Sequence, residues 1–209
     1  MSAISSAFKN DDLRKKILFS LAMVILYRIG AQIPTPGVDY GGIQAQINSL
    51  TDSSAMYSLI NLFSGGALLK LSVFAVGIMP YITASIIVQL LTVVIPKFEQ
   101  LKKEGQSGQA KMTEYTRYLT VALALLQSAG IVALADRKQL LGQGVPVLKE
   151  DTGIFGLIVM VMVMTSGAVL LMWMGELITD RGIGNGMSLL IFAGIATALP
   201  GQGASILAS

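Results

Sequence analysis

The stretch LINLFSGGALLKLSVFAVGIMPYITASIIVQLLTVVI, residues 59–95, decides the fold of this chain. It is much longer than the about 20 apolar residues that one helix needs to cross a bilayer. Gly65, Gly66 and Lys70 interrupt its first third, and Pro80 interrupts the remainder. A short apolar piece followed by a helix that can span predicts a segment folded back into the membrane. Because irregular backbone at membrane depth is tolerated only against protein or a water-filled cavity, the stretch indicates a cavity or pore.

The composition indicates an integral membrane protein. Hydrophobic residues make up 53% of the 209 residues and charged residues 13%, whereas soluble domains carry about 25% charged residues. The chain contains no Cys and no His. This excludes disulfides, a thiolate nucleophile, a His-ligated metal and a His general base. We therefore expect no enzyme activity, no cofactor and no metal, and the formal charge of +3 does not call for nucleic acid.

Five apolar runs predict transmembrane helices, because an isolated strand cannot satisfy its backbone hydrogen bonds in lipid. The first run follows a basic leader, but Arg28 interrupts it and no small-residue cleavage site follows. A retained span is therefore favoured over a signal peptide. The runs cover residues 17–33, 74–95, 118–135, 153–174 and 187–199, of which the last is short.

The basic residues predict the orientation of these spans. They concentrate in the N-terminal leader and in the loop 96–117, and Arg181 lies in the loop 175–186. These three segments lie on one side of the membrane if every run crosses once. The positive-inside rule then places the N-terminus in the cytoplasm and residue 209 on the outer side.

Ionisable and glycine-rich features do not build a catalytic or nucleotide site. Arg28 and Lys70 have no carboxylate within a span to pair with, which disfavours an ion-coupled carrier. Contact with carbonyls or the interface is favoured for Arg28 over substrate binding. The glycines of 182–186 and 105–108 lack the residues that complete dinucleotide and P-loop motifs, so they are interpreted as turns.

Uncharged polar residues after Pro80 allow two interpretations. Thr83, Gln89 and Thr92 are predicted to cluster loosely on one side of a helix, beside an apolar stripe of Ile78 and Ile82. They could be packing contacts with neighbouring helices, or one face toward a pore or lateral opening. The residues alone leave both open.

Several motifs resemble the N-terminal half of the SecY family of bacterial protein-conducting channels. They occur in the family's order across nearly the whole chain. They are YRIG at 27–30, NLFSGGA at 61–67, GIMPY at 77–81, KKEG at 102–105, YTRY at 115–118 and MWMGELITDRGIGNG at 172–186. The resemblance implies an all-α integral membrane protein with five transmembrane helices plus a short re-entrant plug helix. These would form one half of a ten-helix pseudo-symmetric clamshell around an hourglass pore with a lateral gate.

The resemblance also implies roles for individual residues. The pore ring would comprise Ile78, Ile82, Met187 and Ile191. Met187 departs from the family's usual isoleucine, but a flexible apolar side chain should keep the seal. The plug would span 61–71, with Asn61, Leu62, Phe63, Ser64, Gly65, Gly66 and Ala67 in its first part. The lateral gate would use Thr83, Ile86, Ile87 and Gln89.

The implied function is that of the pore-forming subunit of the Sec protein translocase in the bacterial plasma (inner) membrane. Such a channel passes unfolded secretory polypeptides across the membrane and membrane segments sideways into lipid. The implied partners are SecE, SecG, the motor ATPase SecA, the ribosome, signal sequences, nascent polypeptides and lipid. We expect a chain that stops near residue 209 to be a truncated half, lacking the C-terminal half and forming no complete channel alone. The alternatives are a secondary transporter built on broken helices and a membrane scaffold.

Overall fold

The computed structural model describes residues 11–39, 43, 67–68, 70–138, 140, 147–149 and 152–196. Six helices occupy most of this part of the chain, and its only β-type pairings are two isolated bridges. The helices are α2 (Asp11–Gln32), α5 (Met79–Val94), α6 (Pro96–Lys103), α7 (Gln106–Asp136), α8 (Ile154–Arg181) and α9 (Gly186–Ala196). The predicted all-α class is therefore confirmed for the described residues.

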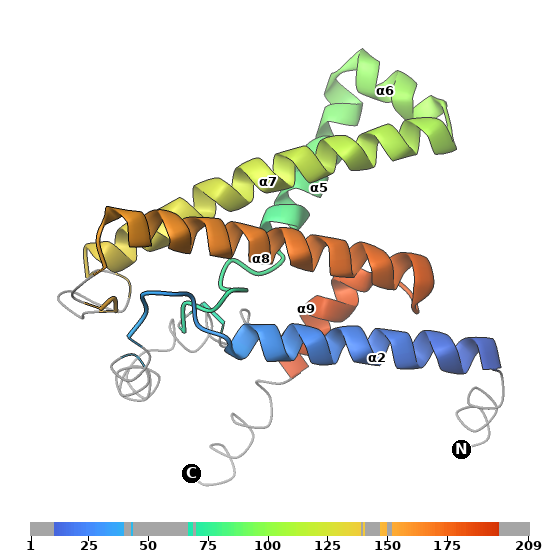
Figure 1. Ribbon diagram of the computed structural model, residues 1–209. Coiled ribbons are helices and arrows are strands. Elements are labelled where there is room, and N and C mark those ends of the chain that lie inside the picture. Colours follow the sequence, from blue (N-terminus) through green and yellow to red (C-terminus); the bar gives the residue numbers. More distant parts are fainter. Residues whose placement is uncertain are drawn as a thin grey trace, which may run out of the picture.

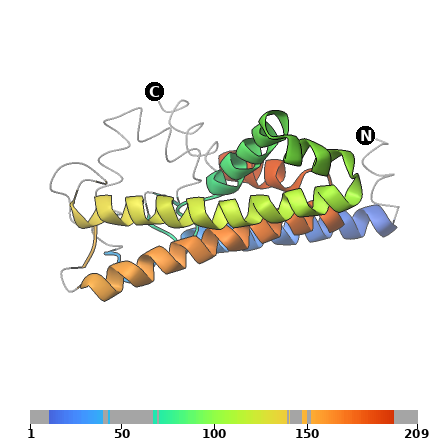
Figure 2. The same ribbon diagram turned by 90° about the horizontal axis from the view of Figure 1, so that it is seen from above.

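The three long helices lie alongside one another, with α8 between α7 and α2 (Figure 1). Helix α5 packs on α7, and α9 packs on α8 and α2, so these two shorter helices cross the layer of long ones (Figures 1 and 2). The short helix α6 caps one end, where Phe98 and Leu101 contact residues of α7. A space bounded by α5, α7, α8 and α9 is the result of this arrangement.

Helix α8 runs opposite to α7 and α2 (Figure 1), which places segments distant in sequence at the same end. At one end Ile183 N–H donates to the Ser20 hydroxyl of α2, at 3.2 Å. At the same end, Arg117 near the start of α7 pairs with Glu176 near the end of α8. Parts of the segments 96–117 and 175–186 thus lie at the same end as the first half of α2, and their side of the membrane stays a prediction.

Backbone hydrogen bonds join the segments at the opposite end. Both the N–H and the hydroxyl of Thr35 donate to the Leu71 carbonyl, at 3.0 and 2.8 Å. The Asp39 N–H donates to the Val147 carbonyl at 3.1 Å. Leu71 is fully buried and has a φ of +45°, a conformation that non-glycine residues rarely adopt. These contacts hold the chain in turns before α5 begins.

Helix α5 therefore begins later than predicted. The apolar run suggests a span over 74–95, but the residues before Met79 form turns. Pro80 lies in the first turn of α5, where its missing N–H has no intrahelical partner to lose. The predicted span 74–95 placed Pro80 inside a helix, and the structure corrects this, because Pro80 opens the helix.

The predicted loops 96–117 and 175–186 are mostly helical. They contain α6, the first turns of α7 and the last turns of α8, and α2 likewise begins before the predicted residue 17. Hydropathy marks where the chain is apolar, whereas backbone hydrogen bonds and capping decide where a helix ends. At Ile95 the axis bends by 100° between α5 and α6, because Pro96 cannot continue the helix and favours an extended residue before it.

By length and composition, two of the described helices can cross a membrane, namely α7 and α8. A third span results if the bent pair of α5 and α6 counts as one. Helix α9 has only 11 described residues, and α2 combines Arg28 with several charges near its start. The structure thus supports a helical membrane protein without establishing the predicted five spans.

Seven of the eleven residues of the predicted plug lie outside the described residues. This applies to Asn61, Leu62, Phe63, Ser64, Gly65 and Gly66. Ala67 is described and is buried in an apolar cluster with Tyr27 and Phe74. Lys70 donates from its ammonium group to the Gln32 amide oxygen at 2.8 Å.

Candidate functional site

A cavity of about 660 Å³ opens between α5, α7, α8 and α9. Its apolar wall comes from α5 and α9 and consists of Ile82, Ile86, Met187 and Ile191. Its polar wall comes mainly from α7, α8 and the turn before α9. That wall includes Gln109, Thr113, Arg117, Glu176, Thr179, Asp180, Asn185 and Ser188. The cavity therefore joins an aliphatic surface to a charged and hydroxyl-lined one.

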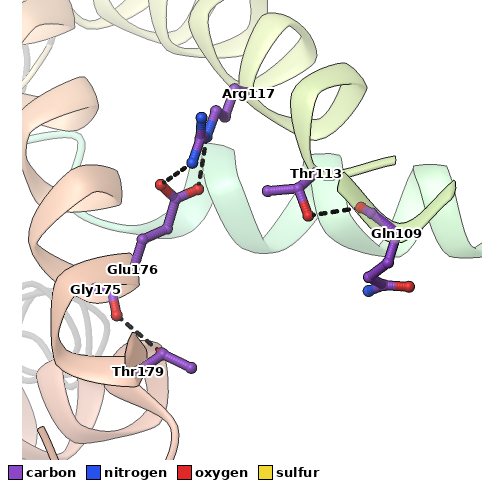
Figure 3. A network of polar contacts seen from close by, with 6 residues as sticks. All are labelled: Gln109, Thr113, Arg117, Gly175, Glu176 and Thr179. Carbon is purple, nitrogen blue, oxygen red and sulfur yellow. Dashed lines mark hydrogen bonds and ion pairs between the residues drawn. The ribbon is translucent and has the colours of Figure 1, made fainter. Parts of the chain in front are cut away.

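The strongest polar contact in this wall joins α7 to α8. Arg117 donates through Nε to Glu176 Oε1 at 3.0 Å and through Nη2 to Oε2 at 2.8 Å. Figure 3 shows the two planar groups facing each other in this fork. The Glu176 side chain is only 14% exposed, whereas Arg117 is 52% exposed. A bidentate geometry fixes direction as well as distance, so the pair holds the two helices in one register.

Hydrogen bonds from the preceding turn fix the start of α9. Asn185 Oδ1 accepts the N–H groups of Met187 and Ser188, at 3.0 and 3.2 Å. This is the N-cap interaction that asparagine favours, and it satisfies donors that the helix itself leaves free. The Thr179 hydroxyl accepts the Gly186 N–H at 2.9 Å. The first turn of α9, which carries Met187, is thereby tied to α8.

The structure brings together three of the four predicted ring residues. Ile82, Met187 and Ile191 line the same cavity, although Ile82 precedes the other two by more than 100 residues. Ile78 does not line it; that side chain packs against the neighbouring apolar cluster that contains Tyr27 and Phe74. The grouping is geometric, and the ring itself stays a prediction.

The four predicted gate residues do not share one face of α5. A helix turns about 100° per residue, so Ile86 and Gln89 follow the face of Ile82, while Thr83 and Ile87 lie roughly a quarter-turn or more around it. Ile86 lines the cavity and is 52% exposed. Gln89 is exposed, and Thr83 and Ile87 are half-buried.

The predicted polar side of α5 also divides. Thr92 is buried, and its hydroxyl donates back to the Gln89 carbonyl at 2.6 Å. Gln89 itself is exposed. The sequence left open whether these residues pack against neighbouring helices or face an opening. Thr92 packs in the interior, whereas the exposed Gln89 can face an opening. The expectation of one common side is corrected, because the nine residues from Thr83 to Thr92 turn the helix by about 900°, which sets these two side chains about half a turn apart.

Sequence reasoning missed the polar wall of the cavity. Arg117 lies within the YTRY motif and Glu176 within MWMGE, so both belong to family motifs, but no role was predicted for either. Opposite charges at the borders of two apolar runs were the available signal. Their separation of 59 residues could not indicate that they meet. Within the described residues, no group of three or more His, Cys, Asp or Glu could hold a metal ion.

The fold is similar to part of the fold of two solved structures. One similar solved structure is "Sec61 in the Canine ribosome-channel complex from the endoplasmic reticulum", with a TM-score of 0.56 and 16% identity over 88% of this chain and 36% of that chain. Another, "The structure of a protein conducting channel", has a TM-score of 0.55 and 16% identity over the same shares. At this identity the likeness concerns the fold alone.

The sequence comparisons establish the family. The SecY family profile matches residues 72–209. Relatives named protein translocase subunit SecY are 74% identical in Corynebacterium glutamicum, over 99% of this chain and 47% of the relative, and 64% identical in Mycobacterium tuberculosis H37Rv, over 100% and 48%. A Streptomyces coelicolor relative of the same name is 56% identical over 96% of this chain and 46% of its own length. The chain belongs to the SecY family, and it spans about half the length of these relatives.

Proposed function

We propose that this chain supplies one half of a protein-conducting channel that moves unfolded polypeptides across, and membrane segments sideways into, a bacterial plasma membrane. The observation that carries the proposal is the cavity wall shared by Ile82, Met187 and Ile191, in a chain of the SecY family. These side chains come from two helices that cross the long helices. A second half-channel facing them would close a constriction.

An aliphatic constriction suits a passage for polypeptides. A translocating chain presents every kind of side chain, so a lining that binds one kind selectively would arrest it. Isoleucine and methionine side chains carry no strong hydrogen-bonding group, and methionine adapts its shape readily, so the lining can part around a chain and meet again behind it. A narrow apolar ring also resists wetting, which blocks ions when the channel is idle.

The polar wall suits the entrance to such a constriction. Arg117, Glu176 and Asp180 line the same cavity as the aliphatic residues, and they lie at the end of the bundle that carries the basic segments. By the positive-inside rule this end faces the cytoplasm. We assign the plug to residues 61–71 and the gate to the face of α5 that bears Ile86 and Gln89. Ile78 would join the ring only if α5 shifts toward the cavity.

We assign SecE, SecG, SecA and the ribosome as partners of the assembled channel. The support is the family of the chain, together with the ribosome–channel complex named for one structural neighbour. Signal sequences, nascent polypeptides and lipid would contact the gate. In this proposal the chain works by binding and displacement and catalyses no bond cleavage.

Site-specific crosslinking tests the proposal. Residues 1–209 contain no cysteine, so a single cysteine can be placed at will. A chimaera in which residues 1–209 replace the matching half of the Corynebacterium glutamicum relative, itself freed of cysteines, provides a complete channel. Ile191→Cys is compared with Phe192→Cys, the next residue of α9, which is 67% exposed and does not line the cavity.

A secretory polypeptide that carries one cysteine and is stalled in transit should form a disulfide with Ile191→Cys and not with Phe192→Cys. The disulfide should also require a functional signal sequence. Equal crosslinking at both positions, or at Phe192→Cys alone, would mean that the polypeptide does not pass along this wall of the cavity.

A further inference from the structure

Helix α9 begins in direct contact with the backbone of α8. A Cβ atom built on Gly186 would overlap the carbonyl oxygen of Gly175 and would stand 2.8 Å from Ile178 Cβ. Gly186 is buried, and Ile178 is fully buried. Any side chain at residue 186 would therefore push α9 away from α8, since a backbone carbonyl cannot rotate aside.

One hydroxyl group joins the two helices at this contact. Thr179 Oγ1 donates to the Gly175 carbonyl at 2.9 Å, which Figure 3 shows. The same oxygen accepts the Gly186 N–H at 2.9 Å. The hydroxyl uses both its donor and an acceptor lone pair, so it fixes the height at which α9 starts along α8. The neighbouring Glu176 ties this turn of α8 to Arg117 of α7.

The Met187 side chain lies in the notch that Gly175 leaves. A Cβ atom built on Gly175 would overlap the Met187 sulfur and would stand 2.5 Å from its methyl carbon. The notch thus receives the thioether of a residue that lines the cavity. The Met187 side chain therefore occupies the space that a side chain at residue 175 would fill.

We propose that Gly175 and Thr179 are positioning residues for the constriction, Gly175 by receiving the Met187 side chain and Thr179 by fixing the start of α9. This inference rests on the proposed channel function. Gly175 sets how far Met187 extends into the passage, and Thr179 sets where Met187 and Ile191 stand along it. Gly175 does not line the cavity, and the Thr179 hydroxyl is engaged by α8 and α9.

The substitution Gly175→Ala separates these roles from general stability. The Cβ added in Gly175→Ala meets the flexible end of the Met187 side chain, which can move. The Cβ added in Gly186→Ala would instead meet the backbone of Gly175. The Met187 methyl must move by about 1 Å to regain an ordinary separation of about 3.5 Å from the new Cβ. Because α8 closes one side, the side chain moves toward the cavity and narrows the passage.

The experiment measures translocation through the chimaera described above, using a precursor whose internal loop is closed by a disulfide and the same precursor after reduction. Gly175→Ala should slow the looped precursor by roughly threefold to tenfold, the factor that matches an off-rotamer side chain costing about 0.7–1.4 kcal/mol. The reduced precursor should be nearly unaffected. Adding Met187→Val should restore the looped precursor. Gly130→Ala, on an α7 face with nothing within 4 Å of the added Cβ, is the matched control.

Thr179 is tested by two variants of similar size. Thr179→Val removes both hydrogen bonds and should raise resting ion conductance, whereas Thr179→Ser keeps the hydroxyl and should behave like the parent. Three results would overturn the inference. Gly175→Ala could slow translocation of the looped and the reduced precursor equally, or Met187→Val could fail to restore translocation of the looped precursor. Thr179→Val could also show the same resting conductance as the parent. Failure of the parent chimaera to translocate at all, or Ile191→Cys crosslinking no better than Phe192→Cys, would instead count against the channel function.

Discussion

The Arg117–Glu176 pair gives the most direct test of how the cavity wall is held. Replacing Glu176 with Gln keeps the size of the side chain but leaves one acceptor oxygen and sets an amide N–H₂ against the guanidinium. Exposed ion pairs contribute about 0.2–1 kcal/mol, and breaking a buried pair costs about 3–5 kcal/mol. Glu176 is 14% exposed and Arg117 52% exposed. The expected loss in the free energy of unfolding lies between the values for exposed and buried pairs, at about 1–2 kcal/mol, because water still solvates the arginine.

The assay is the thermal denaturation midpoint of the purified chimaera in detergent. Glu176→Gln should lower the midpoint by roughly 1–4 °C, because the shift of about 2–4 °C per kcal/mol for 150–250 residues is about halved in a chimaera of about twice the length of this chain. Arg117→Lys keeps the charge but loses the fork, so it should fall between the parent and Glu176→Gln. High salt should reduce the difference in midpoint between Glu176→Gln and the parent only in part, because the Glu176 carboxylate is mostly buried away from solvent ions.

A double-mutant cycle tests whether Arg117 and Glu176 stabilise the protein through their contact with each other. Arg117→Gln and Glu176→Gln together should cost less than the sum of the single variants, because either change alone already removes the pair. Strict additivity, or a Glu176→Gln midpoint indistinguishable from that of the parent, would refute the view that this contact joins α7 to α8. The Lys111–Glu104 pair, at 3.7 Å and with both side chains about half exposed, serves as a control expected to change little.

Three further changes have expected outcomes. Replacing Ile82 and Ile191 with Gly in the chimaera should raise resting ion conductance in planar bilayers, because the aliphatic wall is thinned; an unchanged conductance would contradict their place in the seal. Gly167→Ala would set a Cβ against the Val73 carbonyl and should sharply reduce folded protein recovered from membranes, whereas Gly130→Ala, with open space, should not; equal recovery would show that the Gly167 contact is dispensable. Asn185→Ala should lower the denaturation midpoint by the equivalent of about 1 kcal/mol and Asn185→Asp by less, since aspartate also caps helices; equal loss in both would argue against the cap.

Local sequence signals predicted the helices well and their ends poorly. The apolar runs located α7 and α8, but α7 starts at Gln106 and α8 continues to Arg181, beyond the apolar stretches. Charged residues that leave the hydrocarbon region lower the hydropathy of a window while the helical hydrogen bonds continue. The predicted span 74–95 placed Pro80 inside a helix for a related reason, because the consequence of a proline depends on whether turns or helix precede it.

The predicted site residues divide in a similar way. Family motifs indicated Ile82, Met187 and Ile191, and the structure places them around one cavity. Ile78 packs beside it, and Thr92 turns inward, because the rotation of α5 is set by its packing on α7. The stripe on a helix can be read from its spacing, but which stripe faces a cavity depends on the neighbouring helix.

By itself, the sequence determined that the chain is apolar and helical, and its motifs carry the resemblance to one channel family. These properties are local or compositional, since each residue's cost in lipid and each run's length can be summed along the chain. Only the tertiary structure decided that Arg117 meets Glu176, that Thr179 holds the start of α9, and that Gly175 receives Met187. Those contacts depend on where helices cross, and crossing is fixed by how closely their backbones can approach, which no single segment encodes.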